Sequence, residues 1–243
     1  MIDATATREK LMAVGTSTLA TILFKRGLRN QFVQGVSRLG RRGLKLVGPA
    51  FTLRYIPARE DLDVLSVFRD PDHPQRKACE TIPPGHVRLM DCRGDASAAS
   101  AGSILLTRLQ VRGCAGVVTD GGLRDADTIA ELDIPSFCAA RSAPTNLTRH
   151  HAVALEVPVA CGGVAVYPGD IVVGDGDGVM VVPAGIASDV ADEAYEQEQL
   201  EEFISREVAA GAPLPGTYPP GPEVLARYRE GRNLRTSPVG GEI

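Results

Sequence analysis

The chain has 243 residues, of which 44 % are hydrophobic and 23 % are charged, which is typical of a globular protein with a sizeable core. Disordered and fibrous classes are therefore excluded. Lysine and arginine total 26 against 30 acidic residues, so the formal net charge is -4. This balance gives no electrostatic basis for binding nucleic acid or an anionic membrane, and we expect small, soluble partners.

The five cysteines are an odd number without a Cys-x-x-Cys pair, and no histidine lies at metal-ligand spacing from them. A disulfide framework and a structural zinc site are therefore not expected. Reduced thiols such as Cys114 and Cys138 should instead pack as small hydrophobic side chains. The N-terminus lacks the order of a secretion signal, and the sequence has no apolar run of about 18 residues. We expect a cytoplasmic protein.

The N-terminal part is predicted to contain two helices and two strands. Its first helix covers 16–24, because the opening Thr-Ser-Thr offers a cap and apolar residues follow at helical spacing. The segment 43–57 is predicted to form two short strands joined by a turn at Gly48. A second helix is predicted over 61–68, and the polar, proline-bearing stretch 69–77 is predicted to be a loop.

From residue 86 onward, strand patterns alternate with helical patterns. Two consecutive strand–helix units imply a parallel sheet with right-handed crossovers. The Gly121-Gly122 pair is predicted to turn the chain after the second strand. The predicted strands cover 86–91, 115–120 and 136–140, and the predicted helices cover 104–111 and 126–132, the first with an apolar stripe of Ile104, Leu105, Leu109 and Val111.

The segment 157–183 consists of β-branched runs separated by turn dipeptides, without room for a helix. Pro168-Gly169 suits a type II turn and Asp-Gly pairs suit tight hairpins, so we predict an antiparallel β-meander. Asp170, Asp175 and Asp177 are assigned to these turns, since the further oxygen ligands of a calcium loop are missing.

The C-terminal part is predicted to be a helical extension. A long acidic helix covers 186–210, and 211–222 is too rich in proline and glycine for regular structure. We expect this tail to wrap over the body or over a neighbouring subunit. The predicted division is a catalytic domain of residues 1–186, including the N-terminal helical segment, followed by the extension of residues 187–243.

The strongest chemical signal is the run from Thr119 to Asp125, which ends a buried strand of the predicted parallel sheet. Ligands bind at that end of such sheets. Arg124 offers a fork of donors for a carboxylate, and Asp125 could hold a hard divalent cation. The alternative is that Asp125 only caps the next helix and Arg124 makes a surface ion pair.

A second signal is the segment Gly102-Ser103-Ile104-Leu105, which opens a predicted helix. Free N–H groups and the helix dipole make such an N-terminus an anion site. The alternative is close packing of small residues against the sheet. Because both signals lie where a strand passes into a helix, they should face the same sheet edge, with a substrate carboxylate at Gly102–Leu105 beside a metal at Asp125.

The acidic helix places Glu198 and Glu202 four residues apart, on one helical face. Such a run is usually solvated, but it could also reach a site in a neighbouring subunit.

Taken together, these motifs resemble the RraA family, which includes 4-hydroxy-4-methyl-2-oxoglutarate aldolases and was named for a regulator of ribonuclease activity. The resemblance covers about residues 10–210 in order and is specific over 102–183. It implies a swivelling β/β/α fold, a homotrimer or homohexamer, and active sites between subunits. The motifs that carry it are Gly102–Leu105, Gly113–Asp125, Pro158-Val159, Cys161–Gly163, Pro168–Asp170 and Asp175–Pro183.

The resemblance also implies roles for single residues. Gly102–Leu105 match the loop whose amides bind the substrate carboxylate, Arg124 matches the substrate-binding arginine, and Asp125 matches the ligand of Mg²⁺ (or Mn²⁺). Glu198 or Glu202 of a neighbouring subunit is the candidate for a further metal-site acid. Ser103 departs from the family pattern, because the aldolases usually carry an acid there.

These expectations favour a metal-dependent, class II-type carbon–carbon lyase that acts on a small 2-oxo acid. It would cleave a 4-hydroxy-4-methyl-2-oxoglutarate-type substrate or decarboxylate oxaloacetate, both through a pyruvate enolate. The alternative is an RraA-like inhibitor of ribonuclease E without catalysis, which the net charge of -4 allows through protein contact rather than RNA contact.

Overall fold

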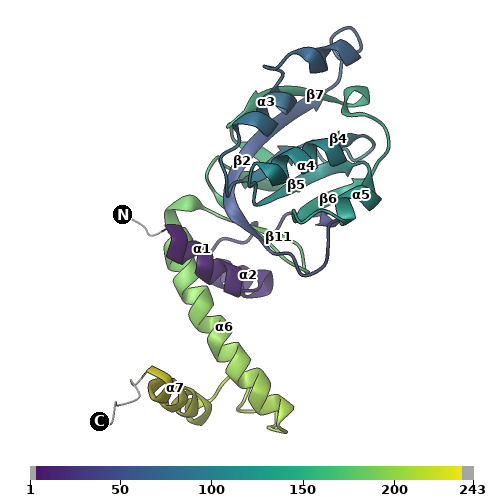
Figure 1. Cartoon of the computed structure of the whole chain (residues 1–243). Helices are drawn as coiled ribbons and strands as arrows, with labels where there is room; N and C mark the ends of the chain where they lie inside the picture. Colours follow the sequence, from purple (N-terminus) through teal and green to yellow (C-terminus); the bar gives the residue numbers. More distant parts are fainter. Residues whose placement is uncertain (1–3, 237–243) are drawn as a thin grey trace, which may run out of the picture.

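The computed structural model describes residues 4–236, and its centre is a mixed β-sheet (Figure 1). In this part of the chain the sheet has nine strands in the order β1-β6-β5-β3-β2-β10-β11, with β4 added to β5 and β7 added to β2. Strands β2, β3, β5 and β6 run parallel, which was predicted for β3, β5 and β6 but not for β2. The segment 157–183, predicted as an antiparallel meander, contains two antiparallel hairpins, β8–β9 and β10–β11. The pairs β1–β6, β2–β7 and β2–β10 are antiparallel as well.

The bounds of the elements are as follows. The strands are β1 (Ser37–Arg38), β2 (Leu46–Pro57), β3 (Val87–Asp91), β4 (Ala99–Ala101), β5 (Gly116–Leu123), β6 (Ser136–Arg141), β7 (His150–Leu155), β8 (Val159–Cys161), β9 (Val164–Val166), β10 (Ile171–Gly174) and β11 (Val179–Val182). The helices are α1 (Ala4–Ala13), α2 (Thr16–Lys25), η1 (Leu65–Arg69), α3 (Pro74–Thr81), α4 (Ser103–Val111), α5 (Ala126–Ala130), η2 (Asn146–Thr148), η3 (Ala184–Ile186), α6 (Ala187–Ala209) and α7 (Pro222–Thr236).

Apolar side chains form three packed clusters that hold these layers together. Helices α3, α4 and α5 cover one face of the sheet (Figure 1) through residues such as Cys79, Leu106 and Ile129. A second cluster packs the β8–β9 hairpin against the sheet. In the third, α1, α2 and α6 pack on β10 and β11, for example through Leu19 and Val190. Burial of this apolar area is the main stabilising contribution, and it leaves one end of the parallel strands open.

One long strand, β2, replaces the two short strands predicted for 43–57. It continues through Gly48 and Pro49, pairing with β10 up to Pro49 and with β3 from Ala50 onward. A Cβ atom at Gly48 would collide with the carbonyl oxygen of Gly85. The predicted turn was therefore wrong: the glycine allows close packing where the strand changes neighbours.

The segment 61–77 also differs from its prediction. The helix expected over 61–68 is reduced to the short 3₁₀ helix η1. The loop expected over 69–77 ends at Pro74, where α3 begins with proline in its first turn. Proline suits that position because its fixed φ is already helical and the missing N–H would have no partner there. As a result Gln75 and Arg76 lie on a helix.

Two further predictions are corrected in the strand–helix units. Gly121 and Gly122 lie inside β5 rather than in a turn, and a Cβ at either would come within 2.6 Å of Cys92 Sγ or Ser142 Cβ. The helix α4 is confirmed, but its apolar stripe was predicted correctly only at Leu105 and Leu109. Ile104 and Val111 are 80 % and 72 % exposed, whereas Leu109 is fully buried.

The capping of α2 differs from the prediction as well. Its N-cap residue is Gly15, and no side chain of the Thr-Ser-Thr run caps it. Instead, Asp175 accepts hydrogen bonds from the N–H and Oγ1 of Thr16, each at 2.7 Å, and Glu198 accepts one from the N–H of Gly15 at 3.1 Å. Two distant carboxylates therefore satisfy this helix end.

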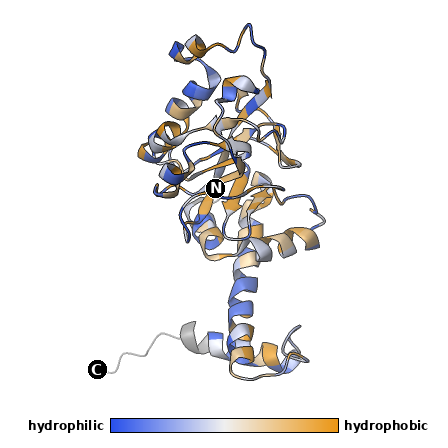
Figure 2. Cartoon of the chain, turned by 90° about the vertical axis from the view of Figure 1, so that its right-hand side faces the viewer, coloured by the Kyte–Doolittle hydropathy of each residue, from blue (hydrophilic) through white to orange (hydrophobic). Residues whose placement is uncertain are grey.

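The C-terminal extension forms an arm. As predicted, α6 is long, and it extends away from the sheet (Figure 1) with a hydrophilic middle section (Figure 2). Helix α7 was not predicted. It packs on the far half of α6 through the rings of Phe203 and Tyr228, 5.7 Å apart, and through an Arg227–Glu207 ion pair of 2.6 Å.

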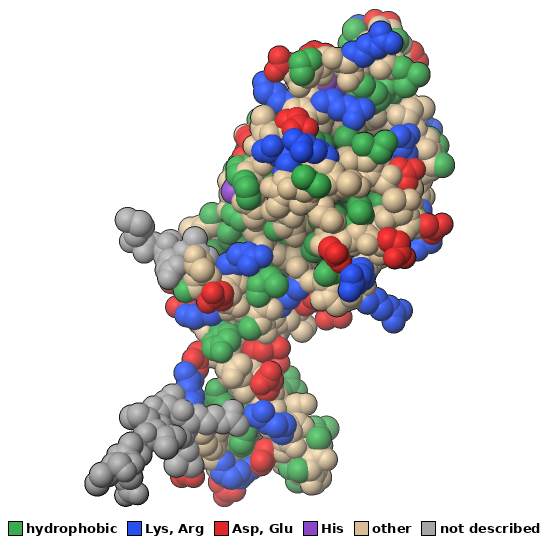
Figure 3. Space-filling view, in the orientation of Figure 1, with side chains coloured by type: hydrophobic (Ala, Val, Ile, Leu, Met, Phe, Trp, Pro, Cys, Tyr) green, Lys and Arg blue, Asp and Glu red, His purple; other side chains and the backbone are tan. Residues whose placement is uncertain are grey.

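The chain after the predicted tail thus packs on its own α6 and not on the body, while the alternative contact of the tail with a neighbouring subunit stays a prediction. Residues 237–243 lie outside the described part. Figure 3 shows the narrow connection between body and arm, with acidic side chains along it. All five cysteines are buried free thiols, as predicted. No helix within residues 4–236 is long and apolar enough to cross a membrane.

Candidate active site

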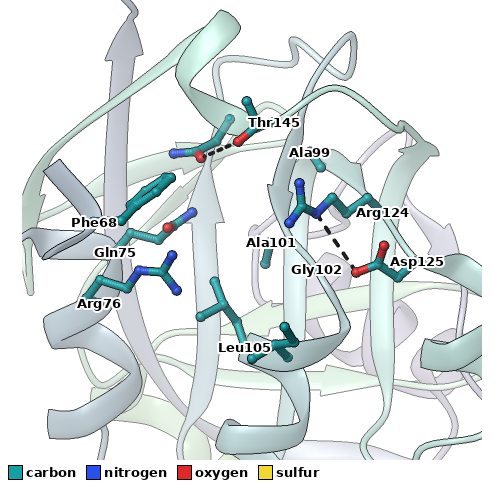
Figure 4. A pocket seen from close by; sticks show the side chains of 12 residues that line it. Phe68, Gln75, Arg76, Ala99, Ala101, Gly102, Leu105, Arg124, Asp125 and Thr145 are labelled. Atoms are coloured by element: carbon teal, nitrogen blue, oxygen red, sulfur yellow. Dashed lines mark hydrogen bonds and ion pairs between the residues drawn. The ribbon is translucent and has the colours of Figure 1, made fainter. Parts of the chain in front are cut away.

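A cavity of about 100 Å³ lies at the carboxyl ends of the parallel strands. The chain segments that follow β4, β5 and β6 all reach it, and α3 and η1 close the opposite side (Figure 4). This is the sheet edge at which parallel α/β folds bind ligands. The lining residues are Phe68, Gln75, Arg76, Ala99, Ala101, Gly102, Ile104, Leu105, Arg124, Asp125, Thr145 and Asn146.

The structure brings the two signals of the sequence together. Gly102, Ile104, Leu105, Arg124 and Asp125 line the same cavity, as their places after neighbouring strands predicted. Ser103, the remaining residue of the predicted loop, contacts Asp125: its N–H and its Oγ both donate to Asp125 Oδ2 at 3.0 Å. The side chains of Arg124 and Asp125 lie on one side of the cavity (Figure 4).

Asp125 does not cap the helix that follows it. It adopts a left-handed conformation with φ 61° and ψ 44°, and its side chain makes no cap hydrogen bond to α5. Such a conformation costs a non-glycine residue about 1 kcal/mol. The carboxylate turns instead toward the N-terminus of α4, where the N–H of Ser103 lowers the pKa of Asp125. The structure therefore favours the site interpretation over the simple helix cap.

Gly102 is required by the close approach of these groups. A Cβ atom there would lie 2.7 Å from Asp125 Oδ2 and 2.8 Å from Arg124 Nε. Any larger residue would push both side chains out of place. The glycine is therefore explained by the site itself, and not only by packing of small residues against the sheet.

Arg124 keeps its guanidinium available to a ligand. Its Nε is 3.9 Å from Asp125 Oδ2, and the two side chains are 44 % and 41 % exposed. An exposed pair at this distance contributes little to stability. The backbone N–H of Arg124 donates to the carbonyl of Ala101 at 3.1 Å, which fixes the chain from which the side chain extends. A planar fork of donors is thus held at the cavity wall.

The sequence analysis named no residue of the opposite wall as a site residue. Gln75 and Arg76 were assigned to a loop, whereas proline followed by a helix-forming run could have indicated α3. Thr145 and Asn146 follow the carboxyl end of β6, so the rule that identified Arg124 could also have identified them. Phe68 carries no comparable signal.

Asp120, within the same motif, has a structural role. It is 4 % exposed and accepts hydrogen bonds from the N–H groups of Cys92 and Gly94 at 2.6 and 2.9 Å. Burial raises the pKa of its carboxyl group, while these N–H groups oppose the shift. It therefore joins the loop after β3 to β5, and it is not among the lining residues of the cavity.

Neither Glu198 nor Glu202 lies among the lining residues of the cavity in its own chain. The Glu198 carboxylate accepts hydrogen bonds from Gly15 and from Thr18 Oγ1 at 3.1 and 2.7 Å. Glu202 is exposed on α6. Within residues 4–236, no group of three His, Cys, Asp or Glu side chains could hold a metal ion. A single chain therefore offers one carboxylate, that of Asp125, at the cavity.

That carboxylate suits a hard divalent cation that keeps most of its water. Asp125 Oδ2 accepts both bonds from Ser103, and Oδ1 has no hydrogen-bond donor among the described residues, so one oxygen is free. Mg²⁺ is commonly held by one or two carboxylates together with water and substrate oxygens. The donor set fits such a cation and does not fit zinc, which takes three or four protein ligands.

The comparisons with known proteins agree with the resemblance of the motifs. A family model described as RraA-like, Aldolase/RraA, matches residues 16–181. The chain belongs to the RraA-like family. A protein of Halalkalibacterium halodurans, whose name marks it as a candidate 4-hydroxy-4-methyl-2-oxoglutarate aldolase, is 34% identical over 169 residues, which are 68% of this chain and 72% of that protein.

Solved structures of the RraA-like fold support this placement. RraAS2 of Streptomyces coelicolor, described as an unusual member of the RNase ES inhibitor RraA protein family, is 33% identical with a TM-score of 0.72, over 83% of this chain and 96% of that chain. An uncharacterized protein of Pseudomonas syringae pv. tomato is 26% identical with a TM-score of 0.76, over 88% and 98% of the two chains. The RraA-like family therefore contains relatives named for catalysis and relatives named for inhibition.

Proposed function

We propose that this protein is a divalent-metal-dependent carbon–carbon lyase of 2-oxo acids. Its substrate would be a 4-hydroxy-4-methyl-2-oxoglutarate-type acid, oxaloacetate, or both. The observation that carries the proposal is the meeting of Arg124, Asp125 and the N-terminus of α4 at one cavity. The similarity to a relative named as a candidate aldolase adds support.

Arg124 and the N-terminus of α4 would have different roles in the reaction, according to their charge and hydrogen-bond donors. Both reactions break the bond between C3 and C4. The aldol cleavage removes the proton of the 4-hydroxyl and releases C4 as the carbonyl carbon of a second pyruvate, and the decarboxylation releases C4 as CO2. Each leaves a pyruvate enolate, with negative charge on the 2-oxo oxygen, and this enolate takes up a proton to give pyruvate. Arg124 would hold the substrate and neutralise part of that charge by a two-point contact. The N-terminus of α4, at Ser103–Leu105, would face the substrate carboxylate with its positive dipole end.

Asp125 would hold Mg²⁺ or Mn²⁺, which supplies Lewis-acid stabilisation of charge on the substrate oxygen when it is bound. Ser103 positions the Asp125 carboxylate through two hydrogen bonds. Glu198 or Glu202 of a neighbouring subunit is proposed as the further acid of a site shared in a trimer or hexamer. Glu202 is exposed on α6, and Glu198 uses only Oε2 for hydrogen bonds within its own chain, so both remain candidates for that acid.

The test is pyruvate release from oxaloacetate and from 4-hydroxy-4-methyl-2-oxoglutarate, measured by coupling to lactate dehydrogenase. We expect turnover with Mg²⁺ or Mn²⁺ and its loss in EDTA. Asp133→Ala serves as the control for changes at Asp125, since Asp133 makes an exposed surface pair with Arg41. Absence of metal-dependent turnover with both acids would overturn the proposal.

A second candidate function is inhibition of a ribonuclease E-type enzyme without catalysis. It is favoured by the 33% identity to RraAS2, a relative described within an inhibitor family. Addition of the purified protein to a ribonuclease E cleavage assay tests it. Inhibition by the wild type and equally by Asp125→Ala would support this function, whereas no inhibition at micromolar protein would eliminate it.

A further inference from the structure

The wall of the cavity opposite Arg124 contains a second arginine without an acidic partner. Arg76 and Arg124 enter the cavity from opposite sides (Figure 4). No carboxylate of the described residues lies within ion-pair distance of Arg76, and its Nε is buried without a hydrogen-bond partner. A buried donor left unsatisfied is costly, so an arginine in this state indicates a missing acceptor.

A second hydrogen-bond donor without a partner belongs to a residue that lines the same cavity. Asn146 is 4 % exposed, and its Nδ2 has no hydrogen-bond partner. Its Oδ1 accepts a hydrogen bond of 3.4 Å from Thr145 Oγ1. The amide oxygen of Asn146 therefore has a partner, whereas the amide nitrogen has none. Both unsatisfied groups are donors. A ligand that satisfies them must therefore present acceptor oxygens.

Arg76 is fixed rather than freely mobile. Its guanidinium lies over the ring of Phe68, 4.4 Å from the centroid, which restricts the side chain by a cation–π contact. The preceding residue, Gln75, anchors α3 by donating to the carbonyl of Ser100 at 2.8 Å. The carbonyl of Gln75 in turn accepts a bond of 3.2 Å from the fully buried Arg88. The positive charge is thus presented by a rigid part of the fold.

We propose that Arg76 and Asn146 form a specificity subsite for a second carboxylate of the substrate, across the cavity from Arg124. This inference rests on the proposed function, in which Arg124 holds the 2-oxo acid end. Two cations facing one cavity favour a dianion over a monoanion, because a monoanion leaves one cation unpaired. Arg76 and Asn146 therefore select 2-oxo dicarboxylates over 2-oxo monocarboxylates of the same length.

The experiment uses two unreactive ligands of equal chain length, 2-oxoglutarate and 2-oxopentanoate, which differ in one terminal carboxylate. Affinities are measured by calorimetry on the full chain with Mg²⁺ present. We expect the wild type to prefer 2-oxoglutarate at least tenfold. Arg76→Met should reduce that preference to within about threefold by weakening 2-oxoglutarate alone, and Asn146→Ala should act in the same direction with a smaller change.

Two further variants make the result specific. Arg76→Lys keeps the charge and guards against a folding defect in Arg76→Met, and it should keep part of the preference. Arg108→Met removes an exposed arginine of α4 that pairs with Glu80, and it should leave both affinities unchanged. The inference is overturned if the wild type binds neither ligand, if it shows no preference, or if Arg76→Met weakens both ligands equally.

Because binding is measured without turnover, the two proposals can fail separately. An Arg76-dependent preference in a protein that releases no pyruvate would support the subsite and refute the lyase. Turnover of oxaloacetate without any effect of Arg76→Met on the binding preference would support the lyase and refute the subsite.

Discussion

Helices α2 and α4 begin in similar ways but with different consequences. Each has a glycine at its N-cap, Gly15 or Gly102, and neither is capped by a neighbouring side chain. In each case a carboxylate from elsewhere in the chain accepts the first N–H. At α2, Asp175 and Glu198 together satisfy the helix end. At α4, one oxygen of Asp125 does so beside an open cavity.

A carboxylate that accepts the N–H groups of a helix N-terminus can therefore contribute to stability at one helix and to a candidate site at another. The acids at α2 also accept hydrogen bonds from the hydroxyls of Thr16 and Thr18, and both carboxylate oxygens of Asp175 are used within the fold. The acid at α4 is exposed and retains an oxygen toward the cavity. Substitutions at the two helix ends should therefore separate activity from stability.

The largest effect is expected from Asp125→Ala. Loss of the proposed metal ligand should reduce pyruvate release at saturating oxaloacetate at least about 100-fold, since charge stabilisation in the transition state is lost. Loss of the carboxylate that accepts the first N–H of α4 should cost only about 0.5–2 kcal/mol of unfolding free energy, as for other helix caps. Steady-state kinetics and thermal melting of the same preparation check both values. A variant that melts far earlier yet keeps metal-dependent turnover would identify Asp125 as structural only.

Arg124→Lys should come next. An ammonium group keeps the charge but cannot reproduce the planar two-point contact, so kcat/KM should fall at least about tenfold while the melting temperature stays near that of the wild type. Arg41→Lys, at an exposed surface pair, is the matched control. Full activity of Arg124→Lys would show that charge alone suffices.

Asp175→Ala should give the converse result. It removes the acceptor of the Thr16 N–H and Oγ1 and should lower the unfolding free energy by about 1–3 kcal/mol, with kcat/KM within about twofold of the wild type. Urea denaturation and the pyruvate assay measure the two quantities. Loss of activity in a folded Asp175→Ala protein would contradict the division between the two helix ends.

Ser103→Ala should have a smaller effect. Asp125 would lose the hydroxyl donor and keep the N–H donor, both now at 3.0 Å. We expect about 0.5–1.5 kcal/mol of lost stability and a weaker apparent affinity for Mg²⁺ with little change in kcat at saturating metal. A metal titration of initial rates checks this. A fall in kcat at saturating metal would instead give Ser103 a direct part in the reaction.

The smallest effect concerns pH. The N–H of Ser103 lowers the pKa of Asp125 in the folded protein relative to an unfolded value of about 3.9. The unfolded state therefore binds the proton more tightly, and the contribution of Asp125 to stability is present above about pH 4 and disappears as the pH falls through the folded pKa. In EDTA, the melting temperatures of wild type and Asp125→Asn should differ at pH 7 and converge toward pH 3. A constant difference would exclude this linkage.

The sequence predicted one half of the cavity and not the other, for a physical reason. Arg124 and Asp125 follow β5, whose apolar run is easily recognised, and Gly102 opens the helix after the predicted strand 86–91, although the short strand β4 that lies between them was not predicted. Topology then places these residues together. Arg76 comes from the polar, proline-bearing segment 69–77, whose helical part depends on contacts of Gln75 with Ser100 and Arg88, outside the segment. Local sequence patterns do not indicate such contacts between separate segments.

The same limit explains the errors in the fold. Gly48 and Gly121 were interpreted as turns because glycine marks turns in most sequences. Both positions are instead packed against other strands or side chains, where a Cβ atom would not fit. The capping of α2 by Asp175 and Glu198 could not be predicted from local sequence patterns either, because the partners are more than 150 residues away.

The path of β2 has a consequence for how the molecule folds. Its first residues pair with β10, so Pro49 meets Ile171, more than 120 residues later in the chain, while Ala50–Arg54 pair with the much nearer β3. Pairings of such long sequence separation close large loops and slow folding. During synthesis, the parallel core can assemble first, but β2 completes its pairing only after residue 174 has emerged from the ribosome.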